Sequence, residues 1–148
     1  MIQRVNYHSR RAVEVMLAGD AIVSITTPGE RPPELRAWGH VCRLCFNDSN
    51  LPQEPGAFTA KHAEQIIAFV DRLPASVLRL DIHCGGGMYR SPAVARFFAQ
   101  RHGIPFKAPS YSTLIYELLC TVDGLVPMAN FGTDIMLDDQ FLGVQPRN

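Results

Sequence analysis

The sequence has no surplus of charge, since 14 Lys and Arg residues balance 14 Asp and Glu residues. A basic surplus is typical of proteins that bind nucleic acids, so we expect no nucleic-acid partner. No apolar run approaches the roughly 18 residues that a membrane helix needs. The N-terminus also lacks the basic-then-apolar order of a secretory signal. We therefore expect a cytoplasmic protein with no membrane partner.

The sequence has four cysteines in 148 residues. Because nothing indicates export, we expect reduced thiols rather than disulfides. His40, Cys42 and Cys45 could supply half of a metal site, but Cys42 and Cys45 would face opposite sides of a strand. We therefore predict no metal and no cofactor. A further hypothesis is a reversible disulfide between Cys84 and either Cys42 or Cys45, which assumes that their strands are neighbours.

The chain alternates predicted strands with predicted helices. β-branched and apolar runs predict strands at 2–7, 21–26, 41–46 and 77–82. Apolar periodicity and end signals predict helices at 11–17, 58–73, 91–102, 111–122 and 133–142. Prolines and glycines predict a loop at 28–36. This order favours an α/β fold, with one domain over residues 1–148 and a central, mostly parallel sheet flanked by helices.

The helix predicted at 91–102 has a strong start signal, with Ser91 suited to the cap and Pro92 to the first turn. Three glycines separate it from the preceding strand. Ligands of parallel sheets bind outside the carboxyl ends of the strands. Residues 83–91 occupy that place, so we expect the functional site there.

Residues 83–92 read His-Cys-Gly-Gly-Gly-Met-Tyr-Arg-Ser-Pro, a glycine-rich turn that enters a helix. Backbone N–H groups in a tight loop and at a helix N-terminus direct partial positive charge to one point. Arg90 adds a planar fork of donors for two phosphate oxygens. The same field favours the thiolate of Cys84 at its base. The predicted anion-binding residues are Gly85, Gly86, Gly87, Met88, Tyr89 and Arg90.

This segment resembles the signature of the protein tyrosine and dual-specificity phosphatases: His-Cys, two residues, Gly, two residues, Arg-Ser. The matching positions are His83, Cys84, Gly87, Arg90 and Ser91. The resemblance implies a domain of the dual-specificity phosphatase type that forms a phosphocysteine at Cys84. Ser91 would then hydrogen-bond the leaving sulfur, and His83 would brace the loop.

The resemblance also implies a general acid, since the family uses an aspartic acid on a loop about 30 to 40 residues before the cysteine. Asp48 lies 36 residues before Cys84, at a predicted strand end. The pattern Leu44-x-Phe46-x-Asp48 is similar to that of small bacterial phosphatases of this superfamily. We predict that Asp48 is the general acid. The alternative is that Asp48 only caps a turn.

The sequence thus predicts a cysteine-dependent phosphomonoester hydrolase that acts on a phosphorylated protein or a small phosphomonoester. One alternative is a pseudophosphatase that binds phosphorylated ligands without hydrolysing them. Another is an inert buried cysteine in a strand–helix turn. Arsenate reduction and sulfur transfer also use a cysteine in an anion loop, but His83 and the Arg90-Ser91 pair favour a phosphatase. The choice between phosphotyrosine and phosphoserine or phosphothreonine stays open, because we find no phosphotyrosine-recognition loop of the Lys-Asn-Arg-Tyr type.

Overall fold

Four parallel strands form one sheet, in the order β1-β4-β2-β3. The computed structural model describes residues 1–16 and 18–128. The strands are β1 (Arg4–Ser9), β2 (Gly19–Thr26), β3 (Trp38–Cys45) and β4 (Arg79–Cys84). Each predicted strand is present, with ends shifted by up to three residues. The prediction of an α/β domain built on a parallel sheet is confirmed.

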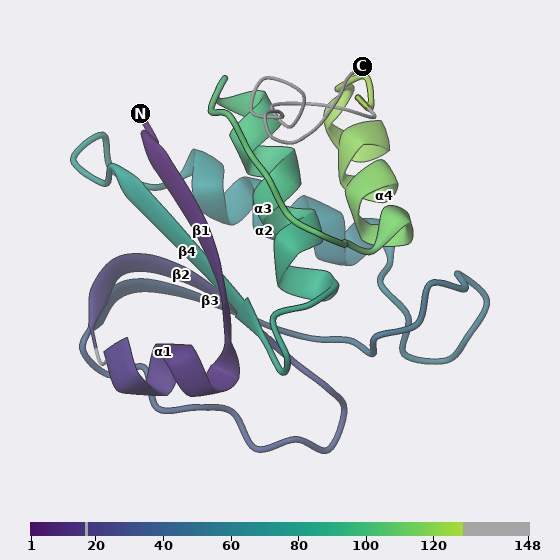
Figure 1. The fold of residues 1–148 in the computed structure, drawn as a ribbon, viewed down its shortest axis with the longest axis horizontal. Helices are drawn as coiled ribbons and strands as arrows, with labels where there is room; N and C mark the ends of the chain where they lie inside the picture. Colours follow the sequence, from purple (N-terminus) through teal and green to yellow (C-terminus); the bar gives the residue numbers. More distant parts are fainter. Residues whose placement is uncertain (17, 129–148) are drawn as a thin grey trace.

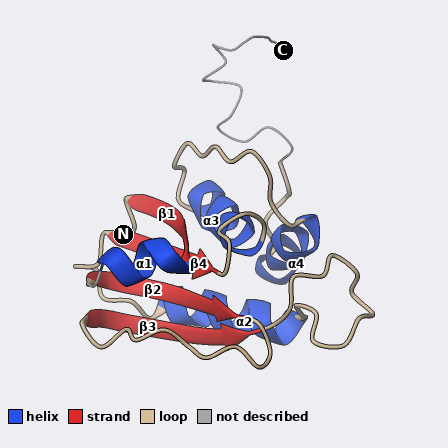
Figure 2. Ribbon diagram, turned by 60° about the horizontal axis from the view of Figure 1, so that its bottom comes forward, coloured by secondary structure: helices blue, strands red, loops and turns tan. Residues whose placement is uncertain are grey.

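Helices lie on both faces of the sheet (Figures 1 and 2). They are α1 (Arg10–Met16), α2 (Ala60–Asp71), α3 (Arg90–Arg101) and α4 (Thr113–Asp123). Helix α1 covers one face, and α2, α3 and α4 cover the other. The helix predicted at 133–142 lies outside the described residues. None of the helices in the described part of the chain is long and apolar enough to cross a membrane.

The main core lies between the sheet and helices α2, α3 and α4. Alternate residues of a strand point to opposite faces, so Leu80, Ile82 and Cys84 of β4 belong to this core. Asp81 and His83 point to the α1 face, where both are buried. A smaller apolar cluster supports α1 on that face and comprises Val13, Ile22, Leu35 and Trp38.

The start of α3 differs from the prediction. The helix begins at Arg90 and its cap position is Tyr89, which makes no capping hydrogen bond through its side chain. The prediction that Ser91 caps the helix is therefore wrong. Ser91 lies inside the first turn, and its hydroxyl is 3.2 Å from the sulfur of Cys84. Serine is a good cap residue, but here the hydroxyl of Ser91 contacts the sulfur of Cys84 instead of a backbone N–H of the helix.

Candidate active site

The carboxyl ends of three strands meet at one edge of the sheet. Cys84 ends β4, Thr27 directly follows β2, and Phe46 directly follows β3. The side chain of Arg90, at the start of α3, joins these ends through hydrogen bonds to Thr27 and Phe46. The parallel sheet therefore gathers the candidate site at the edge where such sheets bind ligands.

The sulfur of Cys84 lies at the base of the glycine-rich loop. It accepts hydrogen bonds from the backbone N–H of Gly87, at 3.2 Å, and of Ser91, at 3.4 Å. Cys84 is only 2% exposed, but these donors belong to the loop and to the first turn of α3. Converging N–H groups favour a negatively charged group over a neutral one. The surroundings of the sulfur thus differ from those of a cysteine packed only against apolar side chains.

The loop is packed tightly against the end of β1. Gly87 has a φ of +70°, and a Cβ at this position would lie 2.7 Å from the backbone nitrogen of Ser9. Glycine adopts such a φ without steric cost, and it lets the two backbones approach closely. The N–H of Arg10 also donates to the carbonyl of Gly85 at 3.1 Å. These contacts fix the loop amides relative to the sheet.

Arg90 is buried, with 6% of its surface exposed. Its Nη1 donates to the hydroxyl of Thr27, at 3.1 Å, and to the carbonyl of Phe46, at 2.9 Å. Its Nη2 lies 3.4 Å from the position that a Cβ on Gly85 would occupy. Its Nε is buried and has no hydrogen-bond partner among the described residues. A buried donor without a partner is costly, so this guanidinium suits a bound anion.

Asp48 lies on the loop that leaves β3, with 55% of its side chain exposed. Its Oδ1 is 3.7 Å from Nε of Arg90. Beside it is a cavity of about 320 Å³ that borders the glycine-rich loop. The residues that line this cavity are Asp48, Asn50, Tyr89, Tyr111 and Ser112. The structure therefore brings the predicted general acid to the predicted anion site, next to space for a further chemical group.

His83 is fully buried on the α1 face of the sheet. Its Nε2 lies 2.6 Å from the hydroxyl of Ser24, and its Nδ1 lies 3.4 Å from the carbonyl oxygen of Cys84. Burial lowers the pKa of His83, and this effect outweighs the hydrogen bond to the Cys84 carbonyl, which raises it. A neutral imidazole held in this way supports the backbone below the loop.

The remaining cysteines differ from Cys84 in their surroundings. Burial raises the pKa of Cys42 to about 11, and burial is also the largest cause of the raised pKa of Cys120. Cys45 is exposed, while Cys42 is buried in the main core, so the two do face opposite sides of β3. In the described part of the chain, no group of three or more His, Cys, Asp or Glu side chains is placed to hold a metal ion.

The hypothesis of a disulfide with Cys84 rests on a wrong assumption about the sheet. β2 pairs with both β3 and β4 and therefore lies between them. Two strand spacings amount to about 9.6 Å, whereas a disulfide needs Cα atoms within about 7 Å. Neither Cys42 nor Cys45 is therefore in a position to cross-link to Cys84 in this fold.

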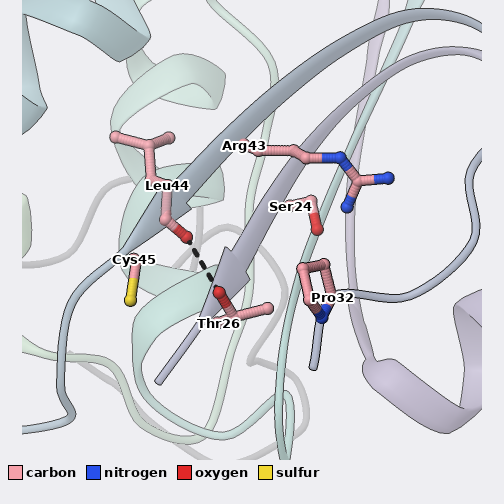
Figure 3. Close-up of a pocket in the computed structure, with 6 residues that line it drawn as sticks. All are labelled: Ser24, Thr26, Pro32, Arg43, Leu44 and Cys45. Atoms are coloured by element: carbon pink, nitrogen blue, oxygen red, sulfur yellow. Dashed lines mark hydrogen bonds between the residues drawn. The ribbon is translucent and has the colours of Figure 1, made fainter. Parts of the chain in front are cut away.

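A second cavity, of about 190 Å³, lies along β2 and β3 (Figure 3). Its lining comprises Ser24, Thr26, Pro32, Arg43, Leu44 and Cys45. Cys84, Arg90 and Asp48 do not line this cavity. We therefore place the candidate site at the glycine-rich loop and not in this cavity.

Several groups of the site were not anticipated from the sequence. Arg90 is held by a backbone carbonyl, that of Phe46, and a carbonyl leaves no signal in the residue type. Thr27 could have been noticed because it follows the end of a predicted strand. Tyr111 and Ser112 come from the segment before α4, whose place beside the loop depends on tertiary packing.

No protein-family model matches this chain, and no curated protein matches its sequence.

Proposed function

We propose that this protein is a cysteine-dependent phosphomonoester hydrolase of the protein tyrosine or dual-specificity phosphatase type. The observation that carries the proposal is the pair formed by Cys84 and Arg90. The sulfur of Cys84 accepts hydrogen bonds from two backbone N–H groups. The buried guanidinium of Arg90 has an Nε donor with no hydrogen-bond partner among the described residues. A nucleophile and an anion-binding group at the same loop fit the transfer of a phosphoryl group.

In the first step, the thiolate of Cys84 attacks phosphorus, and the bond from phosphorus to the leaving oxygen breaks. Arg90 and the loop amides hold the other phosphate oxygens and stabilise their charge in the transition state. The protonated carboxyl group of Asp48 donates its proton to the leaving oxygen. The products of this step are an alcohol or a phenol and a phosphocysteine.

In the second step, water attacks the phosphocysteine while the Asp48 carboxylate takes up a proton from it. The bond from phosphorus to sulfur breaks, which releases inorganic phosphate and restores the thiolate. The hydroxyl of Ser91, 3.2 Å from the sulfur, donates a hydrogen bond that stabilises the sulfur as it leaves. The cavity beside Asp48 has room for the leaving group. The mechanism requires a reduced thiol, in keeping with the cytoplasmic location expected from the sequence.

The proposal is tested with 4-nitrophenyl phosphate and the variant Cys84→Ser. We expect the wild type to release nitrophenol and to yield a phosphocysteine when the reaction is quenched with acid. Cys84→Ser should lose turnover but still bind inorganic phosphate, because Arg90 and the loop amides are unchanged. Turnover at the wild-type rate in Cys84→Ser would exclude the mechanism. Binding of a phosphopeptide without any release of phosphate by the wild type would instead select the pseudophosphatase alternative.

A further inference from the structure

The side chain of Asn50 joins the Asp48 loop to the N-terminus of α4. Its Oδ1 accepts hydrogen bonds from the backbone N–H of Leu114, at 2.9 Å, and from the hydroxyl of Ser112, at 3.1 Å. Its Nδ2 lies 3.0 Å from the hydroxyl of Thr113. Leu114 is in the first turn of α4, where N–H groups lack partners within the helix. Asn50 therefore caps α4 from a loop that is 64 residues away in the sequence.

The same segment also holds the glycine-rich loop. The N–H of Ser112 donates to the carbonyl of Tyr89 at 2.9 Å, and the hydroxyl of Ser110 donates to the carbonyl of Met88 at 3.1 Å. Helix α4 itself is anchored in the main core by its buried face. The start of α4 thus contacts both the loop that carries Cys84 and Arg90 and the loop that carries Asp48.

Asp48 needs such a contact because its own interaction with the site is weak. Its carboxylate is 3.7 Å from Nε of Arg90, beyond hydrogen-bond distance, and more than half of its side chain is exposed. An ion pair whose carboxylate is half-exposed holds that carboxylate poorly, because water screens the attraction. Asn47 shapes the loop from within, by bonds to Ser49 and Pro55, but these bonds do not reach α4.

We propose that Asn50 is a positioning residue that holds the Asp48 loop at the distance from Arg90 at which Asp48 protonates the leaving group. The inference rests on the proposed function and extends it to a residue that contacts neither Cys84 nor Arg90 in the structure. It also gives the start of α4 a role in catalysis, because both the glycine-rich loop and the Asp48 loop are hydrogen-bonded to it.

The test compares two aryl phosphates whose leaving groups differ in basicity. The leaving oxygen of phenyl phosphate needs a proton, because phenolate is strongly basic. The 2,4-dinitrophenolate group is weakly basic and leaves without one. The readout is kcat/KM, which reports only the steps up to formation of the phosphocysteine, because Asp48 also acts in the later hydrolysis that both substrates share. Asn50→Ala should lower kcat/KM for phenyl phosphate by about 10- to 100-fold, the effect of a misplaced catalytic group. For 2,4-dinitrophenyl phosphate, kcat/KM should stay within about threefold of the wild type. A merely structural defect would lower kcat/KM for both substrates alike.

Three further variants make the result specific. In Asp48→Asn, the addition of Asn50→Ala should cause no further loss in kcat/KM for phenyl phosphate, because both residues act through the same proton transfer to the leaving group. Asn50→Asp keeps the acceptor for Leu114 and should restore most of kcat/KM for phenyl phosphate. Gln53→Ala, an amide removed from the same loop at an exposed position, is the matched control and should behave like the wild type.

Two failures can be told apart. If wild-type turnover depends on Cys84 but Asn50→Ala lowers kcat/KM equally for both substrates, the role of Asn50 alone is overturned. The same holds if the losses in kcat/KM of Asp48→Asn and Asn50→Ala add in the double variant. If the wild type shows no turnover that depends on Cys84, the proposed function fails and this inference fails with it. Affinity for inorganic phosphate, measured by calorimetry, should be the same in Asn50→Ala and the wild type, because the glycine-rich loop keeps its own contacts.

Discussion

Oδ1 of Asp48 lies 3.7 Å from Nε of Arg90, and that Nε is a buried donor with no hydrogen-bond partner among the described residues. The proposed acid and the proposed phosphate-binding group are thus neighbours before any substrate binds. A phosphate oxygen that bonds to Nε would take the position nearest to the carboxylate. In the proposed mechanism, a proton on Asp48 would remove the repulsion between its carboxylate and the incoming phosphate, and that proton would then pass to the leaving oxygen.

Asp48→Asn separates these two effects. The variant should lose about 10²–10⁴ in kcat with phenyl phosphate, the usual size of a lost acid–base contribution. Its affinity for inorganic phosphate should stay equal or rise by up to about fivefold, because a half-exposed ion pair contributes about 0–1 kcal/mol. Steady-state kinetics and calorimetry give the two numbers. A variant that retains wild-type kcat with phenyl phosphate would remove Asp48 from the mechanism.

Arg90→Lys tests the need for a planar guanidinium. The three N–H groups of a lysine ammonium share one nitrogen, so bonds to Thr27 and Phe46 would leave only one donor for phosphate and no planar fork for two phosphate oxygens. We expect a loss of about 10²–10³ in kcat/KM, which is the effect of removing a fixed donor from a developing oxyanion. Arg101→Lys, at the other end of α3 and paired with Asp71 and Asp123, is the control. Equal activity of both variants would contradict the role of Arg90.

Two glycines of the loop should respond differently to alanine. In Gly87→Ala, the new Cβ would meet backbone atoms of Ser9 and His8 at 2.7–2.8 Å, at a φ of +70°. We expect a loss of at least about 1–3 kcal/mol in the free energy of unfolding, and reduced turnover because the N–H bonded to Cys84 moves. In Gly86→Ala, the nearest atom is in the flexible Met88 side chain, at 3.7 Å. Denaturant unfolding should therefore find Gly86→Ala close to the wild type, and a Gly87→Ala protein of equal stability would argue against the tight packing.

Much of this arrangement was open to sequence reasoning because its signals are local. The strand, the glycines and the helix start are consecutive, so Cys84 and Arg90 could be assigned to one loop from residue types alone. The order of the strands is set by packing between distant segments, and this is why β3 was wrongly expected beside β4. The cap of α3 also failed as a prediction, because Ser91 has a competing partner in the sulfur of Cys84. Asn50 lies in a polar turn, and its contacts with α4 join segments more than 60 residues apart in the sequence. No local pattern predicts such contacts.

Oxidation should not join Cys84 to Cys42 or Cys45. Because β2 separates β3 from β4, hydrogen peroxide should convert Cys84 to its sulfenic and then its sulfinic acid, with no cross-link to Cys45. Peptide mapping by mass spectrometry after blocking free thiols gives the product at each cysteine. Cys45→Ser should be oxidised at Cys84 at the same rate as the wild type. A Cys45–Cys84 peptide pair would show that the strand order changes or opens under oxidising conditions.

The buried imidazole of His83 should make the fold less stable in mild acid. Burial lowers its pKa below the ordinary value of about 6.5 that it has when unfolded, so above that pH both states are neutral and its contribution is fully present. As the pH falls below about 6.5, the unfolded state binds a proton more readily than the folded state, and the free energy of unfolding decreases. The decrease ends at the lower, folded-state pKa.

His83→Gln removes this group while an amide can still hydrogen-bond to Ser24. Urea unfolding at several pH values between 5 and 8 should show a shallower fall in stability for His83→Gln than for the wild type. Part of the fall should remain, because burial also lowers the pKa of His62 and His102. His62→Gln serves as the comparison at a half-buried site on α2. The free energy of unfolding could instead have the same pH dependence in the wild type and in His83→Gln. That result would mean that His83 accepts a proton as easily in the folded state as in the unfolded chain, and it would contradict the effect expected from its complete burial.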